Sequence, residues 1–286
     1  MKYGPVYPLV TIKIDARGVG NPAQLAAREV HDIFAIAHPV LAAADLGNVA
    51  LLVDETVQME MEVLGRPPGD ERASVMRRLM AMCISDLSRA IRQTLEDASA
   101  HAELLSARPE MFRAGDGEGS EDERAEAIVA AVERFKSDSL SKAQAMRYPQ
   151  LLEKVQKDLS APLQWAPELT SFQKVRNCLE HRGGIVGPQD VDASGTLVLS
   201  LPYLQAAIVE RDGSRVPLRV GMSLRNASEM QFQVAVRQQN FHLGETIVVE
   251  PKQIAEIAFA VWLFATDIVE KLSTGPGRSV RVEKHI

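Results

Sequence analysis

The stretch ERASVMRRLMAMCISDLSRAIRQTLEDASAHAELLS, Glu71 to Ser106, is the longest periodic run of the chain. Its apolar residues recur at intervals of three and four, the spacing that places side chains on one face of an α-helix. They are Val75, Leu79, Met82, Cys83, Leu87, Ile91 and Leu95. Arginines and acids share the run, as expected of a solvated face. The stretch therefore predicts one long amphipathic helix in a mainly helical protein.

Further patterns precede this run. Residues 7–15 alternate and are expected to form a short strand. A helix is expected from Asn21, with a break at His38-Pro39, because the residue before a proline is disfavoured in the α region. Helical periodicity then resumes over residues 51–64.

Downstream of the run, residues 107–120 are rich in glycine and charge and predict a mobile loop. Ser120 and Glu123 match a capping box, which begins a helix that ends near Ser141. Another helix is expected over residues 149–159, and a further one begins near residues 168–171.

After Gly184 the segments become short and β-like, with turns between them. Asp212-Gly213 lies between alternating apolar runs and indicates a hairpin. Phe232, Val234 and Val236 alternate as a half-buried strand requires. Pro251 then begins a closing helix, in which Trp262 and Phe264 are expected in the core.

These patterns predict a mainly α protein that is α+β overall. We expect a helical bundle over residues 1–186, a small antiparallel β insertion over 187–250, a closing helix over 251–273 that returns to the bundle, and a tail over 274–286.

Composition limits the functional classes. Hydrophobic residues make up 46% of the 286 residues, which allows a sizeable core. A net charge of −6 argues against a protein that coats nucleic acid through bulk charge, but it leaves room for a small basic cleft acting on RNA. The N-terminus lacks the apolar run of a signal peptide, and the apolar segment 254–272 carries Glu256 and Asp267. We therefore expect a soluble cytoplasmic protein with no membrane span, whose Cys83 and Cys178 are reduced and packed.

The most unusual stretch is KVRNCLEHRGG, Lys174 to Gly184. On a helix, Asn177 and His181 share one face, and Arg176 lies about 140° away from His181, within the reach of a long side chain. An apolar stripe of Phe172, Val175 and Leu179 anchors the helix, so packing does not require the polar residues to be inside. The glycine pair is suited to a left-handed helix cap.

An arginine and a histidine in this arrangement suit RNA cleavage by internal transesterification. The reaction needs a base for the 2′-OH proton, an acid for the leaving oxygen and a cation for the charge on phosphorus. Histidine and arginine can fill these roles without a metal or other cofactor. One helix supplies one histidine, so two copies facing each other in a homodimer would complete the set.

The order Arg176-Asn177-Cys178-Leu179-Glu180-His181 reads RNxxxH and resembles the motif of HEPN domains. The resemblance implies an all-helical bundle and a homodimer in which two motifs form one cleft. Many HEPN domains are metal-independent endoribonucleases of toxin–antitoxin or defence systems, so the implied partners are an RNA substrate and a cognate antitoxin. By the same resemblance Arg176 contacts phosphate, Asn177 is its polar partner and His181 is the general acid/base. Lys174 and Arg182, which flank the motif, are predicted to bind substrate.

Three alternatives stay open. The domain can be a noncatalytic HEPN-like binding or dimerisation module, the charges near His181 can belong to a solvated helix end, or the chain can be an unrelated helical regulatory protein. Other candidate sites have weaker signals: His31 and His38 are seven residues apart, too far for a compact metal pair, and the acids near residues 54–62 lack partner histidines. His242 reads as structural.

Overall fold

The structure is a computed structural model that describes residues 10–12, 16–43, 50–52, 58–60, 70–112, 120–210, 212–218, 227–273 and 280–282. The described α-helices are α1 (Asn21–Ala43), α2 (Asp70–Ser106), α3 (Glu121–Gln144), α4 (Tyr148–Asp158), α5 (Ala166–Arg182) and α6 (Pro251–Ser273). The short 3-10 helices are η1 (Ala16–Gly20) and η3 (Pro109–Phe112). None of the helices in these ranges is long and apolar enough to cross a bilayer.

The strands form three antiparallel sheets. The pair β1 (Val10–Ile12) and β7 (Val280–Val282) makes one, and β2 (Ala50–Leu52) and β3 (Gln58–Glu60) make another. The third has the order β5-β4-β6, built from β4 (Thr196–Glu210), β5 (Arg215–Pro217) and β6 (Ala227–His242). The predicted class, mainly helical with a small antiparallel sheet near the C-terminal end, is confirmed.

The chain divides into two compact units. The first comprises residues 1–25, 89–164 and 262–286, and the second comprises residues 26–88 and 165–261. Helices α1, α2 and α6 therefore each contribute residues to both units. Residues 187–250 belong to the same unit as α5.

In the first unit, α3 begins at a complete capping box, as predicted. Ser120 accepts a hydrogen bond from the Glu123 N–H, while the Glu123 carboxylate accepts one from the Ser120 N–H at 2.7 Å. Phe112 is buried with Leu104, Ile128 and Val132, and its ring meets that of Phe135 edge-on at 5.5 Å. The predicted mobile loop over 107–120 is therefore wrong at η3, because an aromatic side chain has a core to enter.

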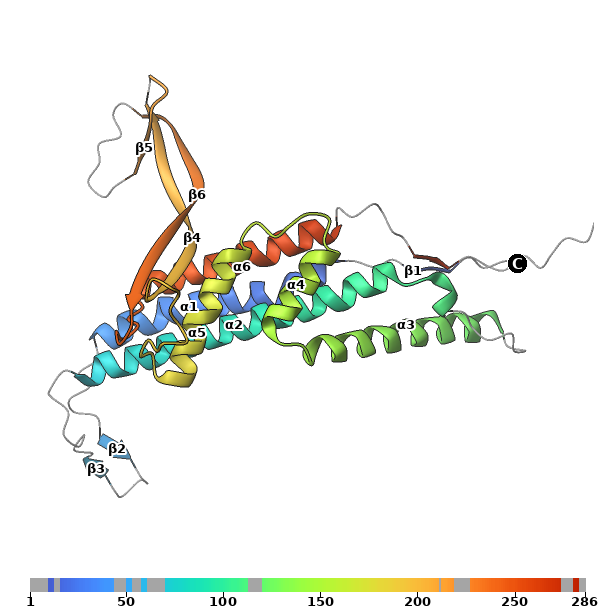
Figure 1. The fold of residues 1–286 in the computed structure, drawn as a ribbon, viewed down its shortest axis with the longest axis horizontal. Helices are drawn as coiled ribbons and strands as arrows, with labels where there is room; N and C mark the ends of the chain where they lie inside the picture. Colours follow the sequence, from blue (N-terminus) through green and yellow to red (C-terminus); the bar gives the residue numbers. More distant parts are fainter. Residues whose placement is uncertain are drawn as a thin grey trace, which may run out of the picture. The chain divides into compact units, whose positions relative to one another are not determined.

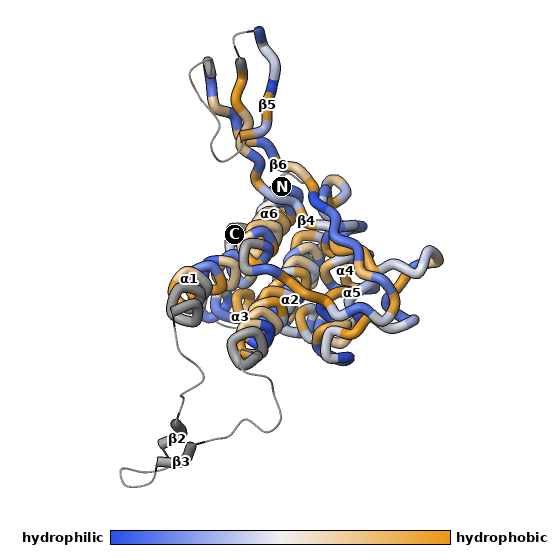
Figure 2. The backbone as a smooth tube through the Cα atoms, turned by 90° about the vertical axis from the view of Figure 1, so that its left-hand side faces the viewer, coloured by the Kyte–Doolittle hydropathy of each residue, from blue (hydrophilic) through white to orange (hydrophobic). Residues whose placement is uncertain are grey.

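In the second unit, β4 and β6 form a long ribbon, and β5 lies beside one end of β4 (Figure 1). The hairpin predicted at Asp212-Gly213 is confirmed, and Gly213 has a φ of 84°, a region that glycine adopts readily. Near its start β4 buries Leu197, Leu199 and Leu201, and this strand contacts α5. Figure 2 shows hydropathy varying from residue to residue along the ribbon.

Two expectations for the N-terminal half are wrong. Helix α1 continues through His38-Pro39 to Ala43, since a proline removes one hydrogen bond without forbidding the helix. The helix expected over 51–64 is replaced, where the structure describes it, by β2 and β3. The apolar positions 57, 59, 61 and 63 alternate with polar ones. This period of two is typical of a strand and agrees with β3.

Two expectations for apolar side chains also need correction. Trp262 is 45% exposed, whereas Phe264 is buried as predicted. Phe232, Val234 and Val236 do alternate on β6, but their side is exposed. The outer parts of the predicted first strand, loop residues 113–119 and most of the tail lie outside the described residues.

Candidate functional site

Helix α5 carries the whole RNxxxH motif, and local sequence explains both of its ends. Pro167 lies in the first turn, where the missing N–H is tolerated. Gly183 ends the helix with a φ of 61°, so the predicted left-handed glycine cap is confirmed. The following Gly184 has a φ of 82° and is buried, and its carbonyl accepts a 2.7 Å hydrogen bond from the Ile247 N–H.

Four apolar residues hold α5 in the second unit. Leu169, Phe172, Val175 and Cys178 are buried, and Val175 and Cys178 have no exposed surface. Phe172 and Val175 belong to the predicted stripe, whereas Leu179 is only partly buried. Both cysteines of the chain are free and buried, as predicted. The helix therefore keeps its place without help from the motif's polar groups.

Arg176 lies on the flank of α5 that meets α2. It forms an ion pair with Glu180, one turn on, and the two side chains keep 25% and 22% of their surface exposed. Arg176 Nη1 also donates to Asn177 Oδ1 at 3.1 Å. Glu180 in turn accepts a hydrogen bond from the Ser85 hydroxyl of α2. Arg176 is therefore held by two neighbours on its own helix, and its partner Glu180 is held from α2.

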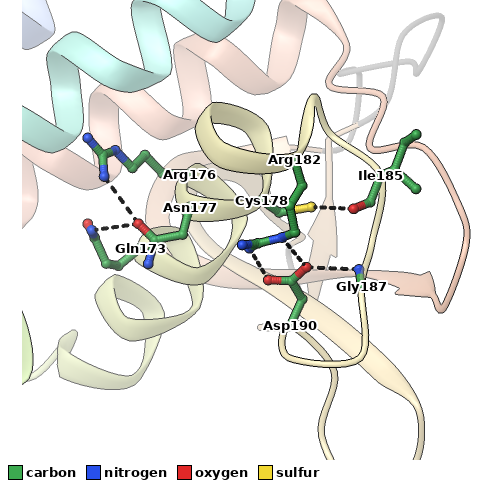
Figure 3. A network of polar contacts seen from close by, with 8 residues as sticks. All are labelled: Gln173, Arg176, Asn177, Cys178, Arg182, Ile185, Gly187 and Asp190. Atoms are coloured by element: carbon green, nitrogen blue, oxygen red, sulfur yellow. Dashed lines mark hydrogen bonds and ion pairs between the residues drawn. The ribbon is translucent and has the colours of Figure 1, made fainter.

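Asn177 occupies the centre of this network (Figure 3). Its Oδ1 accepts from both Arg176 and the Gln173 amide, the latter at 3.3 Å. Gln173 Oε1 accepts from the Ser88 hydroxyl at 2.9 Å, and Ser88 is buried. A chain of hydrogen bonds thus runs from buried Ser88 of α2 to the Arg176 guanidinium. It fixes the amide orientation of Asn177, because Oδ1 is the acceptor in both bonds.

Arg182 lies on the other side of α5 from this network and has a different role (Figure 3). Its Nε donates to Asp190 Oδ2 at 2.8 Å, and its Nη2 pairs with Asp190 Oδ1. Asp190 Oδ2 also accepts from the Gly187 N–H, and the Asp190 side chain is 4% exposed. The predicted substrate residue Arg182 is thus bound to a buried carboxylate that organises the loop after α5.

The same loop covers Cys178. Its thiol donates to the Ile185 carbonyl at 3.2 Å. Burial raises the pKa of Cys178, and the nearby negative charge of Asp190 raises that pKa further. The thiol is therefore kept in its neutral form, which is neither a nucleophile nor a metal ligand.

His181 is exposed in the last turn of α5. Among the described residues it has no hydrogen-bond or ion-pair partner. Lys174 is exposed two turns earlier, and at 100° per residue it shares a face with His181. Arg176 and Asn177 are in contact, but neither is bonded to His181. The chain therefore presents an imidazole without a bonded partner in the described residues and a lysine on one face of α5, with the arginine paired on the adjoining flank.

Four further residues join this site that sequence reasoning did not select: Ser85, Ser88, Gln173 and Asp190. Gln173 precedes Asn177 by one turn, so its contact was accessible from helical spacing. Ser85 and Ser88 are 95 and 85 residues from their partners, and only the tertiary fold brings them close. No group of histidines, cysteines and acids in the described ranges is arranged to hold a metal ion.

Comparisons of this chain with models of protein families, with curated proteins and with solved structures find no match. The inferred function therefore has its basis in the chemistry of α5 and of the residues that contact it.

Proposed function

We propose that this protein is a HEPN-like endoribonuclease that needs no metal and acts as a homodimer, with two α5 ends facing one RNA strand. The proposal depends on one observation: different residues of α5 anchor the helix and present its polar groups. Buried apolar residues hold the helix, and His181 is left exposed with no partner among the described residues. A histidine with no structural bond is available for proton transfer.

The proposed reaction is attack of a ribose 2′-OH on the adjacent phosphorus. One His181 removes the 2′-OH proton as the new P–O2′ bond forms. The bond between phosphorus and the 5′ oxygen breaks, and the partner's His181 gives that oxygen a proton. The products are a 2′,3′-cyclic phosphate and a free 5′-hydroxyl. Imidazole suits both roles because it exchanges protons near neutral pH.

Arg176 would stabilise the charge that builds up on the phosphate oxygens. Its guanidinium now faces the Glu180 carboxylate, which has the same planar pair of oxygens as a phosphate edge. Substrate binding would replace Glu180 with phosphate, while Asn177 keeps its bond to Nη1. Lys174, on the face of His181, would contact a neighbouring phosphate.

A second candidate, a noncatalytic RNA-binding or dimerisation module, is favoured by one specific observation. The charge of Arg176 is already neutralised by Glu180, and Glu180 is itself held by Ser85. If this arrangement persists with RNA bound, no cation is delivered to the reacting phosphate. This candidate predicts binding without cleavage.

The deciding experiment is RNA cleavage in the presence of EDTA by wild type, by His181→Ala and by the control His242→Ala. His242 is also exposed but lies on β6. We expect His181→Ala to lose about 100-fold or more of the rate, the usual contribution of general acid–base catalysis. His242→Ala should cleave like wild type, leaving 2′,3′-cyclic phosphate ends. An unchanged rate in His181→Ala would overturn the proposal, and binding without cleavage by wild type would favour the second candidate.

A further inference from the structure

The outer edge of β6 presents an apolar surface that the described chain leaves uncovered. In the order β5-β4-β6, β6 pairs with β4 on one side, and no described strand pairs with its other side. On one face of the ribbon lie Met230, Phe232, Val234 and Val236, with exposed fractions of 53%, 58%, 39% and 43%. Leu204, opposite Val234 on β4, is 51% exposed.

An unpaired strand with an exposed apolar face is unusual in a protein surrounded by water. Unpaired strand edges are commonly protected by charges, prolines or coverage, because their backbone groups can pair with another chain. Here the exposed side chains of the face are apolar, and a two-stranded ribbon gains little stability alone. The features together indicate a pairing surface.

We propose that β6 pairs antiparallel with β6 of a second copy of this chain, about a two-fold axis at Gln233. In such a pair, residues equally far from Gln233 lie opposite each other. Phe232 then meets Val234 of the other copy, and Met230 meets Val236, so the apolar side chains form cross-strand pairs on one face.

Charge complementarity selects this register. Glu229 and Arg237 are each four residues from Gln233, so the axis at Gln233 places each acid opposite the partner's arginine, on the polar face. An axis at residue 232 would pair Arg237 with Ala227 instead, and one at residue 234 would pair Arg237 with Gln231. Of these three registers, only the one at Gln233 joins opposite charges.

Arg237 is held by residues of its own chain and still keeps exposed surface. Its guanidinium lies 4.6 Å above the Tyr203 ring, and its Nη1 bonds Glu256 Oε1 at 2.8 Å. The Arg237 side chain nevertheless keeps 41% of its surface exposed. Because a guanidinium has five N–H donors, it can bind Glu229 of a second copy without releasing Glu256.

This inference does not depend on the proposed ribonuclease activity. Helix α5 contacts β4, whereas the proposed pairing is formed by residues of β6. A β6-paired dimer can therefore form whether or not RNA is cut.

A cysteine at the axis tests the register directly. Residues directly opposite on neighbouring strands have Cβ atoms about 4.5–5.5 Å apart, close enough for a strained or slightly adjusted disulfide. Gln233→Cys in the full chain should give a covalent dimer on mild oxidation, seen on a non-reducing gel and lost on reduction. The two natural cysteines are buried.

The matched control is Gln238→Cys, an exposed glutamine on the same strand. In the proposed register its two copies are ten residues apart along the strands, about 34 Å, so no disulfide should form. Equal cross-linking of both variants, or none in Gln233→Cys, would overturn the proposal.

A charge swap tests the same contact without a covalent bond. Glu229→Arg should weaken the dimer about 10-fold or more in sedimentation experiments, because it places two arginines opposite each other. A dimer indifferent to Glu229→Arg, or a wild type that is monomeric at tens of micromolar, would each rule out this interface.

Discussion

Two arginines of α5 each pair with a carboxylate, but the two pairs differ in their surroundings. Arg176 pairs with Glu180 on the same helix, and both side chains are about one-quarter exposed. Arg182 pairs with Asp190, which is 4% exposed and also accepts the Gly187 N–H. The first carboxylate is held by one serine hydroxyl from α2, and the second is built into a loop.

The surroundings indicate which of the two arginines can exchange its carboxylate for another anion. A partly exposed pair within one helix contributes little stability and can exchange its partner. A pair with a buried carboxylate resists exchange, because breaking it leaves a charge in a poorly solvated place. We therefore interpret Arg182 as the residue that fixes the end of α5, and Arg176 as the one available to a phosphate.

The largest expected effect follows from Asp190→Ala. It leaves the Arg182 guanidinium and the Gly187 N–H without their acceptor, so the free energy of unfolding should fall by about 3 kcal/mol. Urea unfolding of the variant measures the loss. The control Asp158→Ala removes an exposed partner of Lys154 and should cost less than about 0.5 kcal/mol. Equal losses in the two variants would contradict the structural role of Asp190.

The reactivity of the Cys178 thiol reports on the local effect of Asp190→Ala. Its thiol is buried under the loop that Asp190 organises, and burial raises its pKa. Loss of Asp190 should expose the thiol and remove a neighbouring negative charge, both of which lower the pKa. Cys178 should then react with a thiol reagent faster than in wild type, whereas buried Cys83 serves as the internal reference.

A smaller effect on stability, but a gain in RNA binding, is expected for Glu180→Gln. The change should cost less than about 0.5 kcal/mol, since the pair is partly exposed. It frees Arg176 for phosphate, so single-stranded RNA should bind more tightly, with the salt dependence of log K steeper by about one unit. Fluorescence anisotropy over a range of KCl concentrations measures both.

Net charge alone could also tighten RNA binding, and a second variant separates the two causes. Glu153→Gln removes one acid from an i,i+4 pair with Lys157 on α4, far along the chain from the motif. It should leave RNA affinity and the salt slope unchanged. If Glu153→Gln raises RNA affinity as much as Glu180→Gln does, the gain comes from net charge, and Arg176 is not the residue that binds phosphate.

The two arginine pairs also show which parts of the structure can be predicted from the sequence. Local signals predicted α2, the capping box at Ser120 and the glycine that ends α5, because each depends on residues within a few positions. They failed at residues 51–64, where periods of two and of three to four fitted the same apolar residues. They failed again at Trp262 and Phe232, because a period shows which side chains share a face but not whether anything covers that face.

Within the site, the same limit applies. The contact of Arg176 with Glu180 follows from a spacing of four and was accessible to helical reasoning. Asp190 lies in a loop whose path no periodicity describes, so Arg182 was assigned to substrate. Ser85 and Ser88 become neighbours of α5 only when α2 packs beside it, and their contribution required the tertiary structure.

Substitutions of the two serines of α2 should differ in their effects on the free energy of unfolding. Ser88 is buried and supports Gln173, so Ser88→Ala should cost about 1 kcal/mol, the usual net value of a hydrogen bond. Ser85 supports Glu180 near the surface, where water can replace it, so Ser85→Ala should cost about 0.5 kcal/mol. Parallel urea titrations measure both. A larger loss for Ser85→Ala than for Ser88→Ala would mean that Glu180 is held as firmly as Asp190, and Arg176 would then not be free to exchange its carboxylate for a phosphate.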